Sequence, residues 1–313
     1  MALANVSTLE MDRTQWLRER QKGIGGSDAS IILGFNKWKS PFQLYLEKTG
    51  EHVEEIDNEF IYWGNKLEDV VAKEFEVRTG KKVRKRNQMF RHPEYTFMFA
   101  NIDRDVVGEK ALLECKTTNA FNREAWEGDE VPAAYLCQLQ HYMAVLGYEK
   151  AYIAVLIGGN HFVWKEVERD DEFIDIMIRH EKAFWENHIL AEVPPPIDGS
   201  PSATELLNKL YPTDNGEVIM LDQQSETLVE AIELLKADKK QLEEQLKAYE
   251  NQLKMTLEEA SEGHSHRFKV TYKAQIRNTV DSKRLKAEMP DVYEKFVKPS
   301  TVRVLNIKQM EAN

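Results

Sequence analysis

The sequence predicts an α/β protein, in an α+β arrangement with a mixed sheet, followed by a long helix and a small α+β C-terminal unit. Two observations lead to this fold class. Apolar residues early in the chain are spaced three or four apart, then two apart, then three or four again, as helices, strands and helices require. Beyond a proline-rich break, a stretch with almost no glycine or proline carries a heptad-like apolar stripe.

The first part of the chain is predicted to be helical. The apolar spacing there predicts helices near 14–19, over 41–49 and over 59–79. After the first of these, GIGGSDASIILG places three glycines in a loop. Ser27 then stands where it could cap a further helix formed by SDASIIL.

Strands follow, because the apolar spacing changes to two. The predicted strands are KKVRKRNQMF (81–90), YTFMFANIDRDVV (95–107) and ALLECKTT (111–118). A turn at Gly108, Glu109 and Lys110 joins the last two as a hairpin. The remaining predicted elements are a helix over 133–146, strands over 151–159 and 161–168, and a helix over 170–189.

The chain is expected to divide into four parts. These are a first domain over 1–192, a linker containing Pro, Gly and Ser over 193–217, a long helix or coiled coil over 218–262, and a small basic unit over 263–313. The stripe on the long helix consists of Leu228, Ile232, Leu235, Leu242, Leu246, Tyr249, Leu253 and Leu257, with Lys239 as a polar interruption. A coiled coil and a helix packed on its own domain are both consistent with it.

Composition excludes several classes of protein. Lys+Arg 42 against Asp+Glu 53 gives a net charge of −11, so nucleic acid could be bound only through a local basic patch. The two cysteines, Cys115 and Cys137, are too few for a disulfide framework, a four-cysteine zinc site or an iron–sulfur cluster. No stretch approaches the roughly 18 apolar residues of a membrane span. We therefore expect a cytoplasmic protein without a membrane partner.

The predicted hairpin carries the residues best suited to chemistry. Glu114 and Lys116 are two positions apart in a strand and share a face, and Asp103 on the neighbouring strand could lie next to both. Two converging carboxylates require a cation, and oxygen ligands suit Mg²⁺ or Mn²⁺. The alternative is a surface hairpin with a solvated Glu–Lys pair. The apolar residues around LLECK favour the first interpretation.

Two further features suggest contacts with phosphate. The glycine loop before Ser27, with Arg20 nearby, could form an anion site, although ordinary helix capping would explain Ser27 as well. A basic run between the predicted helix and hairpin could form a duplex-binding stripe or simply a solvated face. Its predicted DNA-binding members are Lys81, Lys82, Arg84, Lys85 and Arg86.

Four segments, in order, carry a family resemblance: RQKGIGGSDASIILG, YWGNKLEDVVAKEFE, NIDRDVVGEKALLECKTT and YLCQLQHYMAVLG. They resemble the YqaJ-like viral recombinase family, relatives of the phage lambda exonuclease in the PD-(D/E)xK nuclease superfamily. The resemblance runs from about Arg20 to about Glu168, and the tail pattern of KVTYK, VDSKRLK and YEKF is similar to that of longer members. It implies a restriction-endonuclease-like PD-(D/E)xK core in the first domain.

The resemblance implies a Mg²⁺-dependent deoxyribonuclease, with Mn²⁺ as a substitute, that digests one strand of linear double-stranded DNA from 5′ to 3′. The exposed single strand would serve phage-type homologous recombination in the cytosol of a bacterial host. The implied partners are double-stranded DNA ends, a single-strand annealing recombination protein and further copies of the chain, as in a trimeric ring.

The family's metal and catalytic residues can be carried over to this hairpin. Asp103 and Glu114 match the metal-binding acids, and Lys116 matches the lysine of the E-x-K element. Cys115 would contribute only its backbone carbonyl to the metal.

The flanking helices supply the other matches. Glu68 matches an acid directed towards the metal, and Gln138 matches a glutamine beside the lysine. Arg20 and Ser27 match the arginine and serine that receive the 5′ phosphate. Arg104 departs from the pattern, because many relatives have a small residue there.

Two other functions remain open at this stage. An endonuclease on the same fold would not need a 5′-phosphate pocket and would cut closed circular DNA. A non-catalytic DNA-end adaptor would recruit an annealing protein through the coiled coil, although such a protein has no need for Asp103, Glu114 and Lys116 together.

Overall fold

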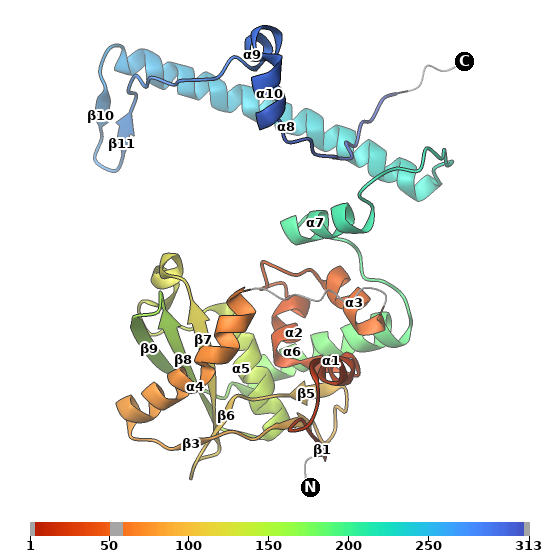
Figure 1. Ribbon diagram of the computed structural model, residues 1–313, viewed down its shortest axis with the longest axis vertical. Helices are drawn as coiled ribbons and strands as arrows, with labels where there is room; N and C mark the ends of the chain where they lie inside the picture. The colour runs from red at the N-terminus through yellow and green to blue at the C-terminus, as the bar shows by residue number, and fades with distance from the viewer. Residues whose placement is uncertain (1–3, 51–58, 310–313) are drawn as a thin grey trace. The chain divides into compact units, whose positions relative to one another are not determined.

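Figure 1 shows a computed structural model of the protein, in which residues 4–50 and 59–309 are described. The chain divides into two compact units, Met1–Lys209 and Leu210–Asn313. Mixed sheets and helices make up the first unit, and the predicted α+β fold class is confirmed. Within the described ranges, no helix is both long and apolar enough to cross a membrane.

A five-stranded mixed sheet forms the centre of the first unit. Its strands run in the order β3 (Val83–Arg84), β6 (Arg104–Val106), β7 (Ala111–Thr118), β8 (Lys150–Ile157) and β9 (His161–Glu168). The β7–β8 pair is parallel and the other pairs are antiparallel. A parallel pair needs a crossover connection. Here η1 (Ala120–Trp126) and α5 (Ala133–Leu146) supply it.

Helices cover both faces of this sheet (Figure 1). On one face, Leu112 of β7 belongs to a hydrophobic cluster with α5, α2 (Gly26–Ile32) and α6 (Asp171–Phe184). On the other face, Leu113 packs with residues of α4 (Glu59–Thr79). Adjacent strand residues point to opposite faces, so this alternation also decides where the charged residues of β7 point.

A second sheet is formed by four short strands from the first hundred residues. Its order is β1 (Ala4–Ser7), β4 (Gln88–Arg91), β5 (Met98–Ala100) and β2 (Ile24–Gly25). Helices α1 (Arg13–Gln21) and α3 (Pro41–Thr49) complete this region, followed after α6 by the π-helical turn Trp185–Leu190.

Two predicted strands are each divided between the two sheets. The range 81–90 contains β3 and β4, and the range 95–107 contains β5 and β6. Asn87, with a positive φ of 46°, turns the chain between the first two. Asp103 lies where the chain passes from β5 to β6, so it stands at the junction of the sheets.

The range predicted as a linker contains a helix, α7 (Pro201–Leu210). Proline is favoured in the first turn, and the Ala203 N–H donates to Ser200 Oγ at 3.1 Å, as in a helix cap. Ala203 and Leu206 are buried in this helix. The prolines at 194–196 lie between helices, but the proline-rich composition concealed the helix that follows.

The second unit contains one long helix and several short elements. These are α8 (Gln223–Leu257), the antiparallel strands β10 (Glu262–His264) and β11 (Lys269–Thr271), and helices α9 (Ser282–Glu288) and α10 (Pro290–Phe296). The segment VRVLNIK (302–308) alternates apolar and polar residues as a strand would, but it forms no strand.

Candidate functional site

Three residues of the β6–β7 hairpin converge. Asp103 directly precedes β6, and its Oδ2 accepts a hydrogen bond from the Cys115 N–H at 2.7 Å. Glu114 and Lys116 point from β7 towards α5, and Lys116 Nζ donates to Glu114 Oε1 at 2.7 Å. The Cys115 side chain instead packs against the cluster on the α4 face. The structure therefore brings the predicted triad together.

Helix α5 adds two side chains to this group. Gln138 Nε2 donates to Glu114 Oε1 at 2.8 Å and to Tyr142 Oη at 3.1 Å. A Cβ on Gly26 would lie 2.5 Å from a carbon of the Tyr142 ring, so only glycine fits against this tyrosine. Sequence reasoning missed Tyr142. Its position one helical turn after Gln138 was the available signal.

The charges of the triad are not balanced. Burial raises the pKa of Asp103 well above its ordinary value, the Glu114 carboxylate raises it further, and Lys116 offsets only part of the increase. Burial alone would lower the pKa of Lys116, but the Glu114 and Asp103 carboxylates outweigh it and raise that pKa. Glu114 Oε2 is buried and has no hydrogen-bond partner among the described residues.

This donor set fits a hard divalent cation. Two crowded carboxylates and a buried unpartnered oxygen are stabilised by added positive charge. Among the described residues, no group of three or more His, Cys, Asp or Glu side chains could hold a metal ion by itself. A cation here would draw on Asp103, Glu114 and the Cys115 carbonyl, with the remaining ligands from outside the chain. Mg²⁺ is commonly held in this way, by one or two carboxylates together with water and substrate phosphate.

The predicted anion site has a different local structure from the one expected. Gly25, not Ser27, is the N-cap of α2, and its N–H donates to Asp28 Oδ2 at 2.9 Å. Asp28 is the third residue of the helix, and its carboxylate accepts from the N-cap N–H as the acid of a capping box does. Ser27 Oγ does not cap the helix and instead accepts from Arg20 Nη2 at 2.8 Å.

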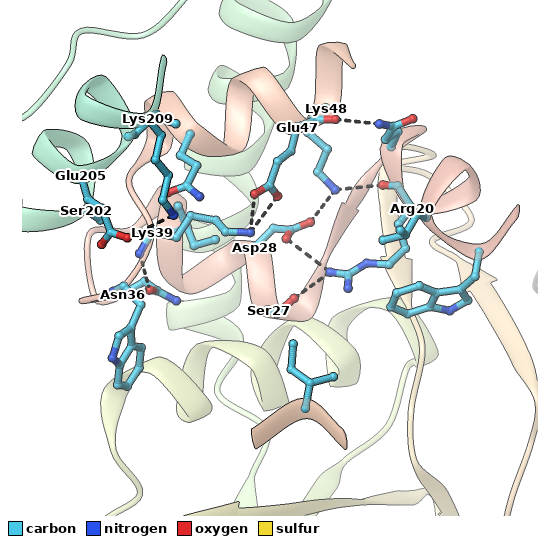
Figure 2. A pocket seen from close by; sticks show the side chains of 18 of the residues that line it. Arg20, Ser27, Asp28, Asn36, Lys39, Glu47, Lys48, Ser202, Glu205 and Lys209 are labelled. Atoms are coloured by element: carbon cyan, nitrogen blue, oxygen red, sulfur yellow. Dashed lines mark hydrogen bonds and ion pairs between the residues drawn. The ribbon is translucent and has the colours of Figure 1, made fainter. Parts of the chain in front are cut away.

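Asp28 is buried and holds Arg20 in place (Figure 2). Its carboxylate lies 2.6 Å from Lys48 Nζ and 3.5 Å from Arg20 Nη2, and Lys48 also donates to the Arg20 carbonyl at 2.9 Å. Burial alone would raise the pKa of Asp28, but Lys48 and Arg20 outweigh it, and the pKa is lowered. The Arg20 guanidinium also lies 4.8 Å from the centre of the Trp16 ring. The Asp28 carboxylate thus faces Lys48 and Arg20, while Ser27 and Arg20 line the neighbouring cleft.

The carboxylates and Arg20 line the same cleft, of about 530 Å³. Its lining includes Arg20, Ser27, Asp103, Glu114, Lys116, Gln138 and Tyr142. A second cleft of about 660 Å³ shares Arg20 and Ser27 with the first and continues past Lys39 and Lys209 (Figure 2). The cleft can therefore accept a chain of linked phosphates, with one phosphate at Arg20 and another beside Asp103 and Glu114.

Comparison with known proteins identifies the family. The model of the YqaJ-like viral recombinase domain matches residues 15–149. Protein YqaJ of Bacillus subtilis (strain 168) is 50% identical over 305 residues, which cover 96% of each chain. This chain belongs to the YqaJ-like viral recombinase family. The predicted resemblance is confirmed.

More distant similarities agree with this YqaJ-like assignment. Protein R354 of Acanthamoeba polyphaga mimivirus is 24% identical over 159 residues, or 46% of this chain and 28% of that protein. The crystal structure of an alkaline exonuclease (LHK-Exo) from Laribacter hongkongensis matches with a TM-score of 0.50 at 20% identity, covering 63% of this chain and 100% of that one. At this identity the match shows a shared fold.

Arg104 accounts for a difference from the pattern expected of a YqaJ-like protein. Glu68 was expected to face the metal, but its carboxylate is paired with Arg104 and lies 3.3 Å from Lys85. Arg104 is buried, pairs also with Asp69, and donates to the Asp103 carbonyl at 2.6 Å. Glu68 still lines the cleft, but the arginine competes for its carboxylate and fixes the backbone at Asp103.

The basic run of this YqaJ-like protein is largely paired with acids. Its ion pairs are Lys81–Glu109 at 2.5 Å, Lys82–Glu76 at 3.9 Å, Arg84–Asp105 at 3.0 Å, Lys85–Glu68 at 3.3 Å and Arg86–Asp105 at 3.5 Å. Pairing of β3 with β6 sets Arg84 opposite Asp105, and α4 supplies Glu68 and Glu76. The run is therefore a weaker concentration of positive charge than its sequence suggested.

Proposed function

We propose that this protein is a metal-dependent exonuclease that digests one strand of linear double-stranded DNA from 5′ to 3′ and so exposes single strand for phage-type recombination. One observation carries the proposal: the Asp103, Glu114 and Lys116 group and the Arg20–Ser27 pair line a single cleft. The shared fold with a protein described as an alkaline exonuclease supports it, as does membership of a viral recombinase family.

Mg²⁺, for which Mn²⁺ could substitute, would be held by Asp103, Glu114 and the Cys115 carbonyl. When bound, such an ion activates water and neutralises charge on a phosphodiester. The Lys116 ammonium, held beside Glu114, would stabilise the additional negative charge on the phosphate as the bond breaks. Gln138 would keep Glu114 oriented, because its amide donates to the carboxylate and is itself braced against Tyr142.

Recognition of the 5′ end is assigned to Arg20 and Ser27. A guanidinium offers several N–H donors in a plane and binds phosphate through two of them. Asp28 and Lys48 would act as positioning residues, because they fix the head and the backbone of Arg20. A terminal phosphate bound here would place an internal phosphodiester of the same strand near the carboxylates, which gives 5′ to 3′ polarity.

The proposal is tested with linear duplexes labelled at the 5′ or the 3′ end, with 5′-phosphate or 5′-hydroxyl termini, in Mg²⁺ or chelator. We expect Mg²⁺-dependent early release of a 5′ label, and faster digestion of phosphorylated ends. No digestion in Mg²⁺ or Mn²⁺ would contradict the nuclease assignment, and early release of the 3′ label would contradict the polarity.

An endonuclease on the same fold is the second candidate. The observation that favours it is the second cleft, since the site at Arg20 and Ser27 opens into further space and is not a closed end. Cleavage of closed circular duplex at a rate comparable to that of linear duplex would support this alternative.

A further inference from the structure

Helix α8 of the second unit presents an apolar stripe that stays exposed among the residues the structure describes. This long helix (Figure 1) spans Gln223–Leu257. None of its 35 residues is buried. The larger apolar side chains of the stripe remain between 45% (Leu253) and 68% (Tyr249) exposed. These are Leu228, Leu235, Leu242, Leu246, Tyr249 and Leu253. A continuous exposed stripe of this kind marks an interaction surface.

The stripe follows the heptad pattern of a coiled coil. Steps of four and three alternate from Leu228 to Leu253. In heptad notation, the a positions are Ile232, Lys239, Leu246 and Leu253, and the d positions are Leu228, Leu235, Leu242 and Tyr249. Repeats sustained over about three to four heptads are long enough for a stable seam.

We propose that a second copy of this chain occupies the stripe, with its α8 helix antiparallel to the first. In an antiparallel pair, a positions of one helix meet d positions of the other. One register satisfies all eight positions at once. It sets Leu228 against Leu253, Ile232 against Tyr249, Leu235 against Leu246 and Lys239 against Leu242 of the second copy.

The charges beside the stripe decide between the two orientations. In a parallel pair in register, Lys239 would face its own copy in the seam, and Asp238 would face Glu243 across it. Both contacts are between like charges. In the antiparallel register, Lys236 of each helix faces Glu243 of the other, which gives two attractive contacts. Lys239 then lies beside Leu242, where its alkyl stem can pack while the ammonium reaches water.

Charge swaps in the full chain provide the test, measured as self-association by sedimentation velocity over a concentration series. Lys236→Glu and Glu243→Lys should each weaken association about tenfold, because two attractive contacts become repulsive. The double variant should return to within about threefold of wild type, because it restores both pairs in reverse. Lys240→Glu makes the same charge change outside the stripe and should leave association unchanged.

Several results would overturn the proposal. In a parallel pair, Glu243→Lys would remove the Asp238–Glu243 repulsion and tighten association. Association that ignores both single variants would place the interface elsewhere, and a wild-type chain that stays monomeric at tens of micromolar or binds only a different protein would exclude self-pairing. Circular dichroism of each variant checks that the helix is retained. The inference does not depend on nuclease activity.

Discussion

Two aspartates, one lining each of the two adjoining clefts, have opposite electrostatic surroundings. Asp28 lies between two cations, Lys48 and Arg20, and its pKa is lowered in spite of burial. Asp103 is only partly buried, but desolvation and a second carboxylate, Glu114, both raise its pKa. The first aspartate already has its counter-charges within the chain. The second has only Lys116 to offset two carboxylates, and this deficit of positive charge distinguishes a cation site from a structural ion pair.

The largest effect is expected on nuclease turnover, when the charge of Asp103 is removed. Asp103→Asn keeps an oxygen for the Cys115 N–H but removes one charge from the cation site. We expect nuclease turnover to fall about a thousandfold or more, equivalent to roughly 4 kcal/mol of transition-state stabilisation. Steady-state digestion of 5′-phosphorylated duplex measures this. Glu127→Gln removes an exposed acid outside the cleft and serves as the matched control; equal losses in the two variants would remove Asp103 from the site.

The same substitution should lower stability at Asp28 but not at Asp103. Asp28→Asn leaves the buried Lys48 ammonium without its counter-charge and should lower the free energy of unfolding by about 3 kcal/mol. Asp103→Asn relieves repulsion and should leave stability in chelator unchanged or higher. Urea unfolding of both variants without metal checks this. Equal losses of unfolding free energy in the two variants would contradict the contrast between Asp28 and Asp103.

Removal of Arg20, which Asp28 holds in place, tests recognition of the 5′ phosphate. Arg20→Ala should reduce the preference for 5′-phosphate over 5′-hydroxyl ends about ten- to a hundredfold, since charge-assisted hydrogen bonds contribute about 1.5–3 kcal/mol. Lysine should restore only part, because it lacks the planar fork. Arg18→Ala, an exposed arginine of the same helix, is the control. A wild-type protein indifferent to the 5′ phosphate would support the endonuclease instead.

The smallest effect is a pH dependence of stability. Because the folded-state pKa of Asp28 lies below its ordinary value of 3.8, its contribution is present above that value and is lost as pH falls below it. The stability difference between wild type and Asp28→Asn should therefore shrink as pH is lowered from 5 towards 3. Chemical unfolding at several pH values measures it, and a constant difference over this range would remove Asp28 as the source.

Local patterns predicted much of the fold. The helices over 41–49 and 59–79 and the hairpin around Gly108 form where apolar spacing and turn residues placed them. Period-two alternation could not show that 81–90 and 95–107 each pass between two sheets, because the pattern continues through the change of partner.

The candidate site was predictable where it depended on strand geometry. Glu114 and Lys116 share a face because they are two residues apart. The ion pairs of the basic run with Glu68, Glu76 and Asp105 depend on pairing between distant segments, which no local pattern records. The buried partner of Asp28, Lys48, lies on another helix and was missed for the same reason.

The most direct test of the contrast between the two aspartates is Mn²⁺ binding followed by electron paramagnetic resonance, which needs no DNA and no turnover. Wild type and Asp28→Asn should bind Mn²⁺ with similar affinity, provided that the latter is studied at a temperature where it is folded. Asp103→Asn should bind at least about tenfold more weakly, because it loses a charged ligand. Equal binding by Asp103→Asn and wild type would contradict the assignment of the cation site.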